Sequence, residues 1–368
     1  MSDCSYDSSD SYMWLSEESP QEIQTSPLDF GQQLKFIFST TAAPQVPNRS
    51  QSEKESLSLV PEDLNLSALE LMIHWSRQTH LSFTRDETTQ EIWQFLVPEE
   101  ALSHKFLMHG LLAISALELA SHGDKISRLH YIKTAAKHQN EALGKFQGLI
   151  SQIDRDNAKA IFAFSSILVV YSFGFLPIEN TDGPSMTMEH LYQVLMLCRG
   201  VEQVIASSRS SIHDSNFSSI LYFTPVEYPW LLSDDSQFAL HQLYEANITC
   251  GTKSASHNSE VYQEAIKTLG EALNESIQDH IPRNVVCRWA INLPQTFLEC
   301  LQKREPMAMV ILSFFCVVLH RLRGVWYFRG WGTSFAKLIW QTLDPEWKVL
   351  VHWSVVEVLG ELPALVLE

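Results

Sequence analysis

Residues 159–175, KAIFAFSSILVVYSFGF, decide the fold because they are apolar on nearly every face of a helix. They lie in the longest uncharged stretch of the chain, between Lys159 and Glu179. The stretch approaches the ~20 residues that a membrane span requires. It also contains three serines and Gly174, which favour protein over lipid as its surroundings. We therefore predict a buried helix at the centre of a bundle, and no membrane span.

Apolar residues on both sides of this run recur at intervals of three and four, the spacing of one helical face. A stripe at 66–73 is one example, and Pro98, followed by Glu99 and Glu100, is predicted to open a long helix through Leu117. Further helices are predicted at 125–150, 186–208, 235–247, 259–277, 282–302, 306–327, 334–343 and 345–359. An irregular connection is expected over 207–219 and beyond. The sequence predicts an all-α fold, an irregular multi-helix bundle of roughly ten or more helices.

The composition supports this fold class and argues against nucleic-acid binding. The chain has 368 residues, 45% of them hydrophobic, and only 14 Gly and 15 Pro. A sheet-rich fold with a tight turn every ~10 residues needs more turn formers. The 26 Lys and Arg against 43 Asp and Glu give a net charge of -17, which repels a phosphate backbone, and no basic patch offsets it. We expect no direct DNA binding.

The cysteines and histidines show no recognisable metal-site spacing. Cys4 is the only cysteine before Cys198, and no CxxC pair occurs. His104 and His109 are five residues apart and lie off a common helical face, while His130 has no carboxylate partner on a facing turn. We expect no metal and no other cofactor.

The signatures of common enzymes are also absent from the sequence, which has no GxSxG, HExxH, Walker loop or GxGxxG. The segment from Gly330 to Gly332 lacks a third glycine and follows a predicted helix rather than a strand. Asp234 and Asp235 begin like an acidic magnesium motif, but position 238 is Phe. We interpret this pair as favourable charge at a helix start, and catalytic residues stay unknown.

Two regions are predicted along the chain: a mobile acidic tail at 1–60 and a helical body at 61–368, with a sub-boundary near 177–184. The tail is rich in Ser, Pro, Asp and Glu. Its apolar island LKFIF, at 34–38, either docks on the body or on a partner or is an incidental patch. The acidic N-terminus lacks the features of a secretory signal, which indicates an intracellular protein. The choice between nucleus and cytoplasm stays open, because no nuclear-type Lys/Arg cluster is visible.

Aromatic residues are concentrated near the C-terminus. Five of the ten Trp lie there, at Trp326, Trp331, Trp340, Trp347 and Trp353. Flat rings and thioethers commonly line apolar ligand cavities, and they also build ordinary cores. The residues alone leave both interpretations open.

Three blocks resemble a known family: WQFLVPEEALSHKFLMHGLLAISALELAS at 93–121, AAKHQNEALGKF at 135–146 and EPMAMVILSFFCVVLHRLRGVWYFRGWG at 305–332. They are similar to the C-terminal regulatory domain of fungal binuclear zinc-cluster transcription factors, and most similar to the sterol uptake control proteins. The resemblance covers about 64–353. Two departures stand out. The six-cysteine zinc cluster of the family's activators is missing, and Ser354 follows Trp353 where the relatives tend to have Pro.

The resemblance implies a hydrophobic pocket for a sterol-like molecule in the C-terminal half of the fold. It places Met307, Val310, Phe314, Phe315 and Trp331 in the pocket and Gly330 and Gly332 in a neighbouring loop.

Two functions remain. One is a transcription-factor-like regulator without a DNA-binding domain, which binds a hydrophobic, sterol- or terpenoid-like molecule and acts through a protein partner or a second copy of the chain. The other is a cofactor-free cyclase of the Diels-Alder type in terpenoid or polyketide specialised metabolism, in which the pocket holds a reactive conformer. The resemblance favours the regulator.

Overall fold

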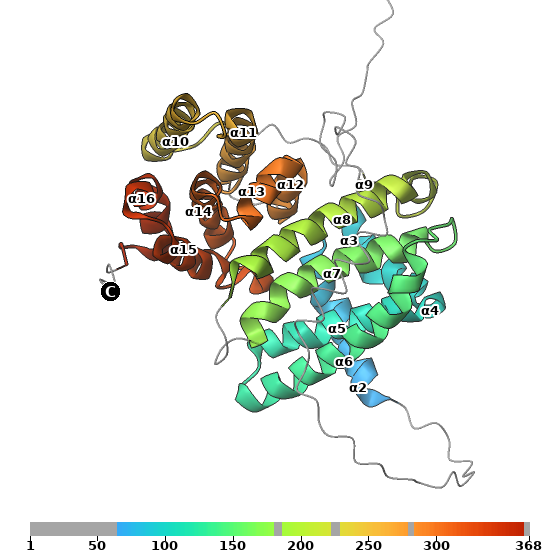
Figure 1. Ribbon diagram of the computed structural model, residues 1–368. Helices are drawn as coiled ribbons and strands as arrows, with labels where there is room; N and C mark the ends of the chain where they lie inside the picture. The colour runs from blue at the N-terminus through green and yellow to red at the C-terminus, as the bar shows by residue number, and fades with distance from the viewer. Residues whose placement is uncertain (1–64, 180–185, 222–228, 279–282, 364–368) are drawn as a thin grey trace, which may run out of the picture.

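The computed structural model describes residues 65–179, 186–221, 229–278 and 283–363 (Figure 1). Within these ranges the chain forms helices joined by short turns, and no strand occurs. The prediction of an all-α, multi-helix fold is therefore confirmed. The tail at 1–60, its LKFIF island and most of the segment 177–184 fall outside these ranges, so the division into regions stays a prediction.

Helix α7 (Ala158–Glu179) contains the apolar run 159–175. It packs against α5 (Lys105–His122) and α8 (Met188–His213). Within the described ranges it is the one helix of sufficient length and apolarity to cross a membrane, but 89% of its most apolar stretch is buried inside the protein. That burial agrees with the predicted core helix.

The N-terminal half surrounds α7 and α5. Its remaining elements are α2 (Leu66–Arg77), η1 (Thr79–Ser82), α3 (Glu87–Glu91), the π-helical turn η2 (Ile92–Leu96), α4 (Val97–Ser103), α6 (Lys125–Leu149) and α9 (Ser218–Leu221). Phe164 of α7 packs edge-on against Phe106 of α5 and Phe146 of α6, with ring centroids 5.6 and 4.7 Å apart. These three rings join the three longest helices of this half at one point.

The C-terminal half is built around α14 (Pro306–Arg321). Its other elements are α10 (Asp234–Lys253), α11 (Ser259–Glu275), α12 (Val285–Asn292), α13 (Gln295–Gln302), η3 (Trp326–Phe328), α15 (Trp331–Thr342) and α16 (Pro345–Leu359). Helices α11, α13, α15 and α16 all contact α14, while α12 and α13 contact α8. Figure 1 shows α8 lying between the two halves.

Side-chain caps explain several helix starts. The Asp124 side chain accepts hydrogen bonds from the backbone N–H groups of Ile126 and Ser127 at the start of α6. Ser233 caps α10, whose first turn carries Asp234 and Asp235. The interpretation of this aspartate pair as helix-start charge agrees with that position.

The predicted helix start at Pro98 agrees with α4, which has Pro98, Glu99 and Glu100 in its first turn, but the prediction of one unbroken helix to Leu117 is wrong. Helical structure begins earlier, at Glu87, because Asp86 caps α3, and continues through the π-helical turn into α4. It then breaks at His104, which has φ -123° and ψ 89°. The His104 ring contacts the Glu100 carbonyl oxygen at 3.1 Å.

Three other predicted boundaries also need correction. The helix predicted at 282–302 is two helices, because Pro294 has no N–H and its predecessor Leu293 is extended, with ψ 137°. Helix α8 continues to His213, through half of the stretch expected to be irregular. The helix predicted at 306–327 ends at Arg321, before the separate turn η3.

Candidate functional site

Helix α14 carries most of the predicted pocket residues. Its first turn contains Pro306, and every residue from Met307 to Leu319 is buried. Met307 and Val310 lie in the N-terminal half of this helix, followed by Phe314 and Phe315. A helix that is apolar on all faces needs partners all around it, and the neighbouring helices supply aromatic rings on at least two sides.

Phe314 and Phe315 contact different neighbours although they are adjacent in sequence. The Phe315 ring stacks on Trp289 of α12, with centroids 3.7 Å apart and planes at 16°. The Phe314 ring meets Trp353 of α16 at 5.1 Å and 41°. Successive residues of a helix point about 100° apart, so α14 has one aromatic contact toward α12 and another toward α16.

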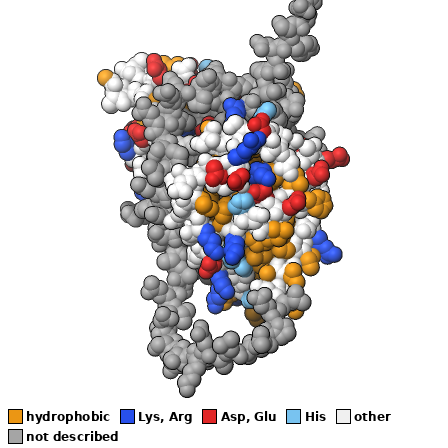
Figure 2. Space-filling view, turned by 90° about the vertical axis from the view of Figure 1, so that its right-hand side faces the viewer, with side chains coloured by type: hydrophobic (Ala, Val, Ile, Leu, Met, Phe, Trp, Pro, Cys, Tyr) orange, Lys and Arg blue, Asp and Glu red, His pale blue; other side chains and the backbone are white. Residues whose placement is uncertain are grey.

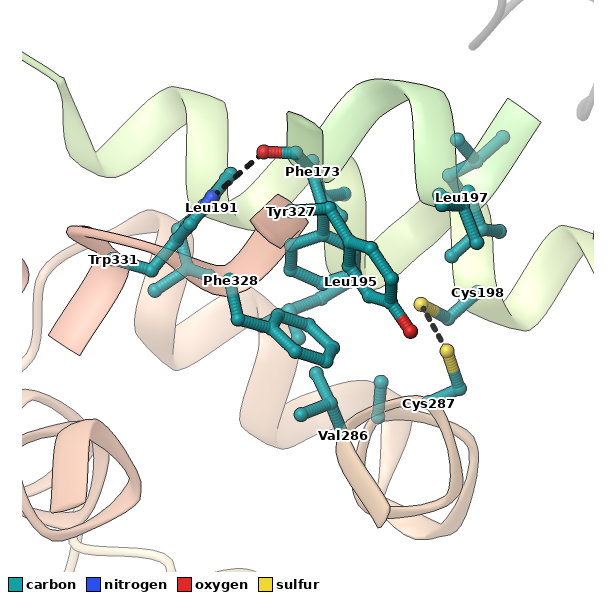
Figure 3. Close-up of a cluster of buried hydrophobic side chains, with 14 of the residues drawn as sticks. Phe173, Leu191, Leu195, Leu197, Cys198, Val286, Cys287, Tyr327, Phe328 and Trp331 are labelled. Atoms are coloured by element: carbon teal, nitrogen blue, oxygen red, sulfur yellow. Dashed lines mark hydrogen bonds between the residues drawn. The ribbon is translucent and has the colours of Figure 1, made fainter. Parts of the chain in front are cut away.

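Trp331 contacts α7 rather than these two rings. Its indole Nε1 donates a hydrogen bond of 2.9 Å to the Phe173 carbonyl oxygen, and the Trp331 and Phe173 rings lie 5.0 Å apart, edge to face (Figure 3). The structure thus places Met307, Val310, Phe314 and Phe315 on one helix and Trp331 at the start of the next. Their shared role in a pocket stays a prediction.

The two loop glycines have separate backbone roles. Gly330 has φ 83°, a left-handed conformation that favours glycine, and is the N-cap of α15. Gly332 allows α15 to touch α14: a Cβ there would lie 2.7 Å from the Cys316 carbonyl oxygen and 2.7 Å from the His320 nitrogen. The loop therefore sets the spacing of α14 and α15.

Sequence reasoning did not single out the polar groups beside α14. The indole nitrogens of Trp289, Trp340 and Trp353 are buried and have no hydrogen-bond partner in the described structure. An N–H donor left unpaired in a protein interior costs roughly 1–3 kcal/mol, and two of these indoles, Trp289 and Trp353, contact phenyl rings of α14. The high density of Trp near the C-terminus was the only sequence feature that pointed to these indoles. It gave no information on whether their N–H groups have hydrogen-bond partners.

A buried pair of hydroxyl groups joins α14 to α16. The side-chain oxygens of Ser313 and Ser354 lie 2.7 Å apart, and both residues are fully buried. Ser354 is the residue at which the sequence departs from the pattern of the resembling family. Helix α16 continues past it to Leu359, and the Ser354 hydroxyl also donates to the Val351 carbonyl oxygen.

The ionisable groups near α14 are suited to neutral packing rather than to acid–base catalysis. Burial raises the pKa of the Cys316 thiol and of the Tyr327 hydroxyl far above their ordinary values. Both groups are therefore protonated at physiological pH. A protonated thiol and a protonated phenol are poor nucleophiles, so neither group is suited to nucleophilic chemistry.

The described histidines do not form a cluster with metal-ligand geometry. Within the described ranges, no group of three or more His, Cys, Asp or Glu residues has the geometry to hold one. His104 contacts Glu100 at 3.2 Å, while the Nδ1 atoms of His109 on α5 and His138 on α6 lie 2.9 Å apart. This contact joins two helices, so the spacing of histidines along the sequence could not indicate it.

The His109–His138 contact predicts lower stability in acid. Burial, followed by the neighbouring His109, lowers the pKa of His138 to about 4. The unfolded chain, with a pKa near 6.5, binds this proton first, so the free energy of unfolding falls as pH drops from about 6.5 to 4. Because the ring is partly exposed, we expect a loss of about 1–2 kcal/mol. Urea unfolding across this range should show it.

His138→Gln should flatten that dependence, since the amide does not titrate. The exposed His241 provides the matched control, and His241→Gln should leave the slope unchanged. Equal slopes for wild type and the His138 variant would contradict the assignment.

The comparisons with known proteins point to fungal transcription factors. No family model matches the chain. A Zn(2)-C6 fungal-type transcription factor of Gibberella zeae is 22% identical over 298 residues, which are 75% of this chain and 58% of that protein. Sterol uptake control protein 2 of Candida albicans is 29% identical over 126 residues, 34% of this chain and 16% of its own length. Its namesake in Saccharomyces cerevisiae is 30% identical over 122 residues, 33% of this chain and 13% of its own length.

These relatives agree with the resemblance read from the three sequence blocks. The chain spans 58% of the first relative and smaller shares of the other two. The chain is therefore similar over most of its length to a fungal Zn(2)-C6 transcription factor, and over about a third of its length to two sterol uptake control proteins.

Proposed function

We propose that this chain is a transcription-factor-like regulatory protein that binds a hydrophobic, sterol- or terpenoid-like molecule between α14 and α16 and acts through protein partners. Its homology to transcription factors supports the regulatory role and an intracellular location. The names of two relatives, sterol uptake control protein 2, suggest the class of ligand.

The unpaired indole of Trp353 is the observation that carries the ligand proposal. Its N–H is buried beside the Phe314 ring and finds no acceptor among the described residues. The Trp289 indole N–H is also unpaired among the described residues. Its ring, however, stacks closely on Phe315, so a ligand would have to separate the two rings to reach it. The Trp353 side chain is only partly buried, so a ligand reaches it with less rearrangement.

A flat, mostly apolar molecule with one oxygen acceptor matches these groups. Its hydrocarbon body would pack against Phe314, and its oxygen would accept the Trp353 N–H. Such a hydrogen bond removes the cost of an unpaired buried donor, so it contributes to binding in addition to the apolar contact.

In this function, partner proteins bind the DNA and this chain does not. The net charge of -17 opposes association with a phosphate backbone. Figure 2 shows one face on which Lys and Arg side chains lie among acidic and apolar ones rather than forming a field of one sign. The partner, a different protein or a second copy of the chain, is part of the proposal.

The test replaces the Trp353 donor without removing its ring. Trp353→Phe should weaken the binding of a 3-hydroxysterol about 5- to 10-fold, the value of one hydrogen bond, and leave the affinity for its deoxy analogue unchanged. Tryptophan fluorescence titration measures both affinities. Trp230→Phe makes the same change at a residue that is 57% exposed and should affect neither ligand.

A second variant separates a binding site from a solid core. Phe314→Ala should change ligand affinity while costing less than the ~3–5 kcal/mol of a truncated core aromatic. A full core-sized loss, with no ligand raising the melting temperature of wild type, would contradict the proposed site. Conversion of a polyene into a cyclised product would instead support the cyclase.

A further inference from the structure

Two cysteines far apart in sequence meet between the two halves of the fold. Cys198 on α8 and Cys287 on α12 place their sulfur atoms 3.3 Å apart. Cys198 is fully buried and Cys287 is 5% exposed. Figure 3 shows the two sulfurs facing each other near the Tyr327 ring, with no atom drawn between them. Both are free thiols in the structure.

Hydrogen bonds between α8 and α12 keep the two thiols close together. Arg199, the residue after Cys198, donates hydrogen bonds to carbonyl oxygens at the C-terminal end of α12, among them Ile291 at 3.1 Å. Both helices are thus fixed to each other within a turn of the two sulfurs. A disulfide requires a sulfur–sulfur distance of about 2.05 Å, so closure needs a movement of little more than an ångström.

We propose that Cys198 and Cys287 are a site of reversible disulfide formation, with a peroxide as the oxidant, and that the bond ties α12 covalently to α8. One thiol, as its thiolate, attacks the peroxide O–O bond and becomes a sulfenic acid, with release of water. The other thiol attacks that sulfur, forming the S–S bond and releasing a second water. In sum, two thiols and one hydrogen peroxide give one disulfide and two waters.

Cys198 reacts slowly while it is buried. Burial raises the pKa of Cys198, so little thiolate forms while the two helices are packed. Oxidation then requires a local opening of α12, and the disulfide forms when the helix closes again. This differs from a surface sensor cysteine, which reacts at once.

The disulfide would restrain the neighbour of α14. Trp289, two residues after Cys287, forms the close stack with Phe315. Fixing α12 to α8 therefore limits how far this ring pair separates. The disulfide itself does not depend on the proposed ligand, so it is tested without one.

The experiment oxidises the full chain with hydrogen peroxide, in buffer and in sub-denaturing urea, followed by alkylation and mass spectrometry of the unreduced digest. We expect a peptide pair cross-linked through Cys198 and Cys287 and a melting temperature raised by about 5 °C or more. Dithiothreitol should reverse both. Cys198→Ser and Cys287→Ser should each abolish the cross-link and the shift.

Cys250→Ser provides the control, because Cys250 lies on α10 and is partly exposed. This variant should retain the cross-link and the shift. The proposal is overturned if Cys198 and Cys287 remain open to alkylation after oxidation in urea, or if the cross-link forms without raising the melting temperature.

Discussion

Arg199→Met should lower the free energy of unfolding by about 3–5 kcal/mol, the loss typical of removing one partner from a buried charged network. Arg199 is only 4% exposed. Its Nη1 donates to the carbonyl oxygens of Ala290, Ile291 and Leu293 at 3.2, 3.1 and 2.6 Å. Methionine fills similar volume but leaves three carbonyls without a donor. Guanidinium chloride unfolding at constant m value measures the change.

The buried neighbour Glu202 adds to this loss. Burial raises the pKa of its carboxyl group, and the positive charge of Arg199 opposes that rise. Arg199→Lys keeps the charge and should recover part of the stability. Arg155→Met, at an exposed residue, should change stability by less than about 0.5 kcal/mol. A similarly small effect at Arg199 would show that α12 is held mainly by apolar packing.

Gly332→Ala should cost about 2–3 kcal/mol, because the added methyl group meets backbone rather than a flexible side chain. The nearest atoms to a Cβ at this position belong to Cys316 and His320 of α14, both 2.7 Å away. Relief requires α15 to move away from α14 along its first turn. Thermal and chemical unfolding measure the loss.

Gly144 offers the opposite case on an exposed face of α6. A Cβ there meets nothing within 4 Å. Gly144→Ala should therefore stabilise the helix by about 0.5–1 kcal/mol through its higher helix propensity. If both alanine variants were stabilising, the close approach of α15 to α14 would be incorrect.

Helices bounded by strong local signals could be predicted from the sequence. The predicted helix at 345–359 matches α16, which has Pro345 in its first turn and Gly360 at its C-cap. The core helix α7 was recognisable from its continuous apolar run. The limits of α16 were marked by its own proline and glycine, whereas α7 continues past the apolar run, through Pro177 to Glu179.

Boundaries that depend on distant residues could not be predicted. The break at Pro294 leaves carbonyl groups that Arg199 satisfies from more than 90 residues away in the chain. A single sequence shows the proline but not its compensating partner, so 282–302 read as one helix. The contact of Cys198 with Cys287, which are 89 residues apart, was hidden for the same reason.

The candidate site shows the same limit. The apolar run of α14 agrees with the burial of Met307, Val310, Phe314 and Phe315 in the structure. It gave no information on the direction of each ring, because a helix that is apolar on every face has no preferred side. The positions of α12 and α16 decide that Phe315 meets Trp289 and Phe314 meets Trp353.

The indole contacts of Trp326 and Trp331 determine when the N-terminal half can complete its folding during synthesis. Trp326 donates to the Ser82 hydroxyl, 244 residues earlier, and Trp331 to the Phe173 carbonyl oxygen, 158 residues earlier. The surface of α7 at Gly174, which has no room for a side chain beside Trp326, receives that ring only after the ribosome has released residue 326. Until then the first half of the nascent chain exposes apolar surface, and a chaperone that covers it during translation should raise the yield of folded protein.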